Sequence, residues 1–170
     1  MAAFDFKKEY RELYLPTGQP QIVDVPEMRF IMVEGKGNPN TSESYKEAVE
    51  ILYGLSYSIK MSKKGDKVPE GYFDYVVPPL EGLWWFENNY FDGNVIGRKD
   101  EFVWIMMIRQ PEFVTQEVFE TAKEVLARKK PELNLSRARL QDFKEGLCAQ
   151  VMHIGSYDDE GPTVAALEEF

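Results

Sequence analysis

Flat aromatic side chains gather in one stretch of this sequence and could hold a planar organic molecule. All three tryptophans of the chain lie between residues 80 and 109. Indole rings give apolar walls of the kind that line ligand pockets, and their faces attract cations. We therefore expect this stretch to form one wall of a ligand cavity, built from Trp84, Trp85, Phe86, Trp104 and Met106. The alternative is that these side chains only fill an aromatic-rich core.

Three glutamates lie in predicted β-strands or directly next to them. Glu34 ends a predicted strand, Glu81 lies inside another, and Glu101 precedes a third. A carboxyl group beside aromatic walls acquires a raised pKa and can act as a base, and a carboxylate also pairs with a cationic ligand. We expect Glu34 and Glu101 to join the ligand wall and assign no catalytic acid or base. The alternative is that all three are solvated charges.

The remaining reactive side chains are few. His153 is the only histidine, which excludes a site of several histidines, and no carboxylate or cysteine spacing suggests another metal site. We therefore expect no metal and no cofactor. His153 in a predicted strand and Tyr157 on the following glycine loop are expected to face the ligand, although either could be structural. Cys148 is the only cysteine, so the chain has no internal disulfide framework.

The elements that position these residues follow from hydrophobic patterning. Two apolar runs, 80–86 and 102–108, flank a polar segment and predict a long β-hairpin with two apolar faces. Residues 21–25 and 28–34 predict two short strands joined at Pro26, and 138–143 and 147–154 predict another pair. Helical spacing predicts helices over about 42–60, capped by Thr41 or Ser42, and over 116–129, capped by Thr115.

Composition excludes several classes of partner. The chain has 170 residues, a net charge of −9 and 44% hydrophobic residues, enough for one packed domain. The negative charge argues against nucleic acid and against an anionic membrane surface. No apolar run approaches the roughly 20 residues that span a bilayer, and the first residues lack a signal-peptide core. We expect a cytoplasmic protein.

Two segments of the chain are similar to each other. Residues 28–37 read MRFIMVEGKG and residues 148–157 read CAQVMHIGSY, so that Met32 aligns with Met152 and Gly35 with Gly155. Each copy has strands, a glycine loop and a helix in the same order. The second copy stops at Phe170, inside its predicted helix. We expect that the natural chain continues past Phe170. The alternative is that a chain ending here folds poorly or associates, for example as a homodimer.

Three segments in this order resemble the GyrI-like small-molecule-binding domain, and in particular a stand-alone subgroup without a DNA-binding domain. They read VPEMRFIMVEGKGNPN, PPLEGLWWF and GLCAQVMHIGSYDDEGPTVAALEEF. The resemblance implies an α+β fold of duplicated β-α-β-β units, whose curved antiparallel sheet forms a barrel-like ligand groove. On this basis the chain divides into an N-terminal arm (1–20) and a single GyrI-like domain (21–170). Within the domain we expect a first unit (21–112), a linking helix (113–131) and a partial second unit (132–170).

The same resemblance implies three functions. The first is binding of hydrophobic aromatic, often cationic, small molecules, as the effector domains of multidrug-responsive regulators do. The second is hydrolysis of the cyclopropane ring of DNA-alkylating antibiotics, as in some stand-alone members. The third is binding to a protein, as in gyrase inhibitors. The family's usual glutamate lies on a strand of the second hairpin, which would come after residue 170, so it is not assigned here.

Overall fold

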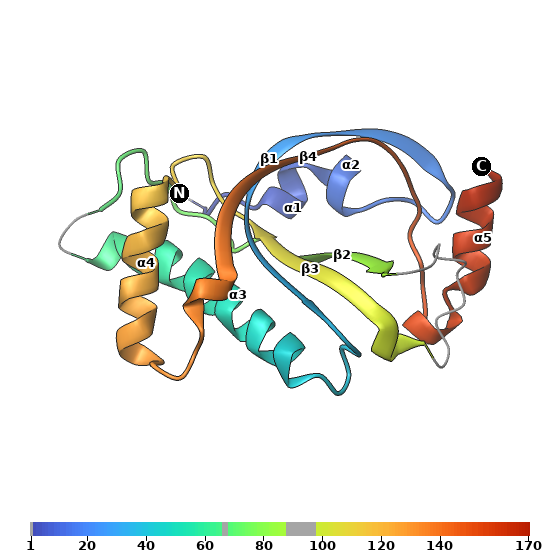
Figure 1. The fold of residues 1–170 in the computed structure, drawn as a ribbon. Coiled ribbons are helices and arrows are strands. Elements are labelled where there is room, and N and C mark those ends of the chain that lie inside the picture. Colours follow the sequence, from blue (N-terminus) through green and yellow to red (C-terminus); the bar gives the residue numbers. More distant parts are fainter. Residues whose placement is uncertain (1, 66–67, 88–97) are drawn as a thin grey trace.

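The computed structural model describes residues 2–65, 68–87 and 98–170 as a mixed α+β domain (Figure 1). The described part of the chain contains five α-helices, four short 3-10 helices and four strands. The α-helices are α1 (Phe6–Glu9), α2 (Arg11–Tyr14), α3 (Glu43–Met61), α4 (Gln116–Lys129) and α5 (Gly161–Glu169). The strands are β1 (Gln21–Lys36), β2 (Leu80–Phe86), β3 (Phe102–Arg109) and β4 (Ala138–Gln150). Within the described residues, no helix is long and apolar enough to cross a membrane.

One antiparallel sheet in the order β2-β3-β1-β4 organises the fold. The predicted hairpin is confirmed, since β2 pairs with β3 from Leu80 opposite Ile108 to Phe86 opposite Phe102. The two predicted pairs of short strands are wrong. Each is one continuous strand, and β1 pairs with β4 from Gln21 opposite Gln150 to Val33 opposite Ala138. Pro26 is accommodated inside β1 because a strand can lose one ladder hydrogen bond at a bend.

The β1–β4 pair forms a ribbon that arches over β2 and β3, so the sheet curls into a half-barrel (Figure 1). The ribbon bends where Val25 lies opposite Gly146. Gly146 has φ +78°, a left-handed conformation that favours glycine. Val23 and Val25 then line the same cavity as Met28, so the alternation of side chains slips by one residue at the bend. The far half of the ribbon is thereby folded back over the sheet.

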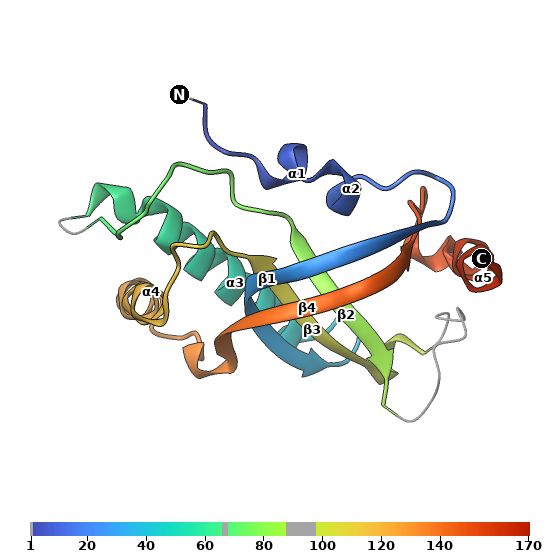
Figure 2. The ribbon, with the colours of Figure 1, turned by 90° about the horizontal axis from the view of Figure 1, so that it is seen from above.

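The outer face of the sheet, defined as the face that packs on α3, carries the main hydrophobic core. Ser42 caps α3 by accepting a hydrogen bond from the Tyr45 N–H at 3.2 Å, and Thr115 caps α4 in the same way, as predicted. The buried side of α3 meets strand residues that alternate onto this face, including Ile31, Val33 and Ile108. Figure 2 shows α3 and α4 together at one end of the molecule and α5 at the other.

Gly35 leaves room for Trp104, its partner across the β1–β3 ladder. A Cβ atom on Gly35 would lie 2.4 Å from the Trp104 ring, which is fully buried. Gly35→Ala is therefore expected to lower the free energy of unfolding by about 1–3 kcal/mol, the usual cost of overpacking. Urea denaturation measures the change. Gly18→Ala is the control, because a Cβ there meets nothing within 4 Å, and equal stability losses in the two variants would contradict the packing described here.

Residues 2–20, which we call the arm, pack against the rest of the described chain. Phe6 is buried, and the Phe4 N–H donates to the Asp74 carbonyl at 2.9 Å. Farther along, the Met152 N–H donates to the Thr17 carbonyl at 2.8 Å, which joins the end of the arm to the segment after β4. Helix α2 is held between these two attachments, and its side chains reach the inner face of the sheet.

Candidate functional site

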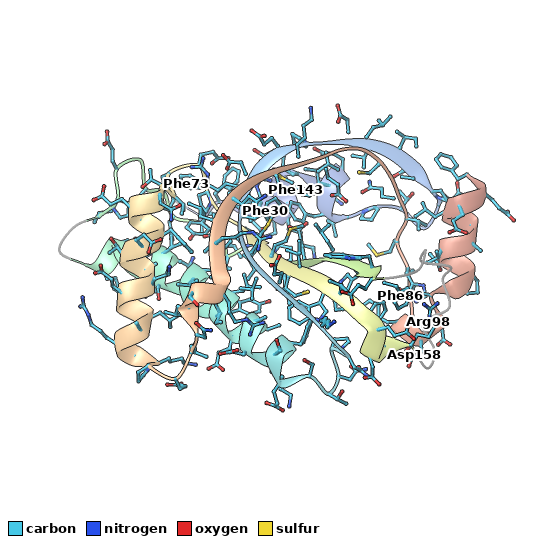
Figure 3. The ribbon with its side chains drawn as sticks, in the orientation of Figure 1. Phe30, Phe73, Phe86, Arg98, Phe143 and Asp158 are labelled. Atoms are coloured by element: carbon cyan, nitrogen blue, oxygen red, sulfur yellow. The ribbon has the colours of Figure 1, made fainter. Side chains whose placement is uncertain are left out.

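The inner face of the sheet, on the side away from α3, carries a second and separate apolar cluster. Its buried members are Met28, Phe30, Met32 and Met107, and its partly buried members are Leu13, Val25, Leu83, Ile105 and Phe143. We call this set the inner cluster. Figure 3 shows Phe30 and Phe143 close together beneath the arch of the ribbon. The cluster places adaptable thioethers and flat rings side by side, which suits contact with varied apolar ligands.

The sequence-predicted wall is divided between the two faces. Trp104 and Met106 belong to the outer-face core, where they are 0% and 3% exposed. The Trp104 indole N–H donates to the Gly37 carbonyl at 3.2 Å, and its ring meets Tyr45 edge-on with 5.3 Å between centroids. These two side chains therefore support the sheet from the side opposite the inner cluster.

The aromatic residues of β2 also lie on both faces of the sheet. Trp84 points to the outer face, where its ring lies 5.3 Å from Phe102 and 5.9 Å from Tyr45. Phe86 is buried there, with its ring stacked 4.9 Å from Phe102 and beneath the guanidinium of Arg98. Trp85 alternates onto the inner face with Leu83, and 39% of it is exposed. Trp85 is thus the predicted aromatic that borders the inner cluster.

The predicted polar residues lie at separate places. Glu34 is on the inner face opposite Ile105, and its carboxylate lies 3.3 Å from Arg139. Glu101 forms an exposed pair with Arg98, also at 3.3 Å. Figure 3 shows Arg98 and Asp158 together with Phe86 at the α5 end of the molecule.

His153 and Tyr157 belong to the loop between β4 and α5. His153 Nε2 lies 2.9 Å from the Ser156 carbonyl, so Nε2 carries the proton, and Nδ1 accepts from the Thr163 hydroxyl at 2.9 Å. This histidine holds the loop against α5. Tyr157 is 80% exposed. Among the described residues, no group of three histidine, cysteine or acidic side chains could hold a metal ion.

A cavity of about 120 Å³ opens beside the inner cluster, beneath α2. It is bounded by α2, by the far halves of β1 and β4, and by one side chain of β2. The residues that line it are Leu13, Tyr14, Val23, Val25, Met28, Glu81, Glu145, Cys148, Ala149 and Gln150. Three of them, Leu13, Val25 and Met28, also belong to the inner cluster, so the cavity and the cluster form one continuous site.

Glu81 supplies the most perturbed acid of this site. It lies opposite Met107 on the inner face, and its Oε2 atom is buried with no hydrogen-bond partner among the described residues. Burial raises the pKa of Glu81 to about 7, with a further contribution from the charge of Glu145, while Arg109 opposes the shift. A carboxyl group with this pKa is present in both protonation states near neutral pH.

Tyr14 and Arg109 complete the polar end of the site. The Tyr14 hydroxyl and the Arg109 Nη1 are both buried without a hydrogen-bond partner in the described structure. Burial and then the charge of Glu81 raise the pKa of Tyr14, and the neighbouring Arg109 guanidinium opposes this rise. The Arg109 guanidinium stacks between the rings of Phe6 and Tyr10, at 4.6 Å from each centroid. Polar atoms left unpaired in an interior are costly, so this cluster calls for a functional explanation.

Sequence reasoning considered Glu81 but did not place it on the expected wall, and it missed Tyr14 entirely. The signal for Glu81 was available, because it is the one charged side chain in the alternating set Glu81, Leu83, Trp85. No comparable signal exists for Tyr14, since its position depends on how the arm docks.

Three comparisons place this geometry among known proteins. The model of a family described as the GyrI-like small molecule binding domain matches residues 18–169. A search of curated protein sequences gives no significant match.

Solved structures from Listeria innocua are similar over nearly the whole chain. One is described as a hydrolase; it is 46% identical, has a TM-score of 0.87, and the match covers 98% of this chain and 78% of that one. A second, described as an uncharacterized conserved protein, is 47% identical with a TM-score of 0.90, covering 98% and 79%. A third, also described as a hydrolase, is 45% identical with a TM-score of 0.89, covering 99% and 80%.

Proposed function

Because this chain belongs to the GyrI-like small-molecule-binding domain family, we propose that its inner face binds hydrophobic aromatic molecules, cationic ones among them, and sequesters a drug or toxin. The observation that supports this proposal is the inner cluster. Four buried side chains, three of them methionines, lie on a sheet face separate from the main core. The inner cluster is not needed to hold α3, and it borders a cavity in which Glu81 Oε2 has no hydrogen-bond partner among the described residues.

Trp85 is the side chain that we expect to cover the bound aromatic group. It is partly exposed and shares the inner face with Leu83. Trp84 is its natural control, because it has almost the same exposure, 36% against 39%, but points to the outer face. An aromatic ring packed against an indole gains about 0.5–1.5 kcal/mol beyond the area that it buries, and about 1.4 kcal/mol is a factor of ten in affinity.

Trp85→Leu is therefore expected to weaken binding of naphthylmethylammonium, a small aromatic cation, by about tenfold. Trp84→Leu is expected to leave the affinity within about twofold of the unmodified protein, which lies within the scatter of surface substitutions. Isothermal titration calorimetry measures both. The proposal fails if no binding is detected, and the inner face is the wrong location if Trp84→Leu produces the larger loss.

A hydrolase that opens the cyclopropane ring of DNA-alkylating antibiotics is the second candidate. Two similar crystal structures, 45% and 46% identical to this chain, are described as hydrolases. The Glu81 pKa of about 7 suits a general base that takes a proton from water. Mass spectrometry after incubation with an intact cyclopropane-bearing antibiotic separates the two functions. Addition of one water to the ligand supports hydrolysis, and complete recovery of the intact ligand supports sequestration alone.

A further inference from the structure

The cavity beneath α2 is too small for a whole drug-sized ligand but large enough for one of its groups. Its volume is about 120 Å³, whereas sites for drug-sized molecules occupy about 300–1,000 Å³. Because Leu13, Val25 and Met28 are shared with the inner cluster, a ligand lying on that cluster could insert one end into the cavity. The lining then decides which chemical group that end carries.

Acceptors predominate in the lining. Two carboxyl groups, those of Glu81 and Glu145, line the cavity, and none of the described residues that line it is a lysine, arginine or histidine. The side-chain amide of Gln150 already donates to the Glu12 carbonyl at 2.7 Å. The buried Oε2 of Glu81 lacks a donor among the described residues. An ammonium group would supply both the missing donors and the opposite charge.

The charged and titratable groups around Glu81 are compatible with an added cation. Tyr14 from α2 stays neutral because its pKa is raised, and Cys148 from β4 likewise stays a thiol. Glu145 adds a negative charge from β4. Among the described residues, Arg109 from β3 is the cation that acts on Glu81. It does not line the cavity, and its Nη2 lies 3.8 Å from Glu112.

We propose that this cavity is an ammonium subsite in which the protonated amine of the ligand replaces the proton of Glu81. The inference rests on the proposed function and adds the position and chemistry of the ligand's cationic group. In the exchange, the neutral Glu81 carboxyl group loses its proton to solvent, and the carboxylate formed pairs with the incoming R–NH₃⁺. No bond of the ligand is broken. A proton and an ammonium group each add one positive charge to the Glu81 carboxylate, so the net charge of the site is the same with either one bound.

Proton exchange makes the affinity depend on pH in a defined way. Below the pKa of Glu81, about 7, binding of an amine releases up to one proton, and affinity rises up to tenfold per pH unit. Above that pKa the carboxylate is already formed, so the affinity levels off. A neutral ligand of the same shape releases no proton and gains nothing from the rise in pH.

Calorimetry with a matched ligand pair tests the inference. Naphthylmethylammonium and the neutral naphthylmethanol are titrated into the full chain at pH 6 and pH 8.5, each in two buffers of different ionisation enthalpy. We expect proton release only for the ammonium and only at pH 6. Glu81→Gln is expected to abolish the release and to weaken ammonium binding at pH 8.5 at least tenfold, with alcohol binding unchanged. Glu27→Gln, an exposed carboxyl group of β1, is the control and should behave as the unmodified protein.

The outcomes separate the two ideas. Equal affinities of the ammonium and the alcohol, or proton release that persists in Glu81→Gln, overturn the subsite and leave small-molecule binding on the inner face intact. Absence of binding by both ligands overturns the proposed function together with the subsite. A thermal melt of Glu81→Gln confirms that the variant used in the comparison is folded.

Discussion

Trp104→Ala is expected to lower the free energy of unfolding by about 3–5 kcal/mol, the usual cost of truncating a buried aromatic side chain. Trp104 is 0% exposed, packs edge-on against Tyr45, and donates its indole N–H to the Gly37 carbonyl. The substitution leaves both a cavity and an unpaired carbonyl. Since a domain of this kind is stable by about 5–15 kcal/mol, the variant should unfold at a much lower urea concentration.

Trp85→Ala is the matched control for this experiment. Trp85 lies on the opposite face and is partly exposed, so its removal should cost less than about 1 kcal/mol. The two variants thus separate the structural tryptophan from the one that we place at the ligand. A larger loss of stability in Trp85→Ala than in Trp104→Ala would mean that the two faces have been assigned the wrong way round.

Glu81→Gln is expected to stabilise the protein at pH 8 by up to about 3 kcal/mol while leaving its stability at pH 4.5 nearly unchanged. The pKa of Glu81 rises from 4.5 to about 7 on folding, and each pKa unit corresponds to about 1.36 kcal/mol. At pH 4.5 the carboxyl group is protonated in the folded chain and half protonated in the unfolded chain, which changes the free energy of unfolding by only about 0.4 kcal/mol, and at lower pH it is protonated in both. Between pH 4.5 and pH 7 the unfolded chain ionises first, so this stabilising contribution is lost as the pH rises.

Urea denaturation of both proteins from pH 4.5 to pH 8.5 measures this linkage. The difference between them isolates Glu81, because the remaining carboxyl groups are common to both. Salt-bridged Asp142 behaves in the opposite sense, since Arg29 lowers its pKa and its contribution is lost only in more acidic solution. A pH-independent difference between Glu81→Gln and the unmodified protein would show that Glu81 is not buried in a neutral form.

Local patterns predicted the separate elements well. The hairpin of β2 and β3 followed from two apolar runs around a polar segment, and α4 matched its predicted bounds of 116–129 because its cap and apolar stripe are both encoded locally. The continuous strands β1 and β4 did not follow from local patterns. Turn-forming residues such as Pro26 and Gly146 predict a break in each strand. The long pairing of β1 with β4 overrides those local signals.

The kinds of side chain in the candidate site could be expected from the sequence, but their positions only in part. Aromatic walls and a carboxyl group of raised pKa were both expected, and the strand alternation that separates Trp84 from Trp85 was readable. Alternation does not tell which of two apolar faces is covered by a helix. Helix α3 covers the face that carries Trp104 and Met106, so these two side chains lie in the outer-face core. The cavity beneath α2 depends on docking of the arm and on the bend of the ribbon, both of which are tertiary features.

Methionine methyl groups provide the most direct measurement of where a ligand binds, because they mark both faces. Met28, Met32 and Met107 belong to the inner cluster, Met106 lies in the outer-face core, and Met61 lies beside the groove between α3 and α4. In a protein labelled with ¹³C at these methyls, titration with naphthylmethylammonium is followed by NMR. We expect progressive, saturable shifts of Met28, Met32 and Met107, with Met61 and Met106 unchanged. Saturable shifts confined to Met61 or Met106 would contradict it.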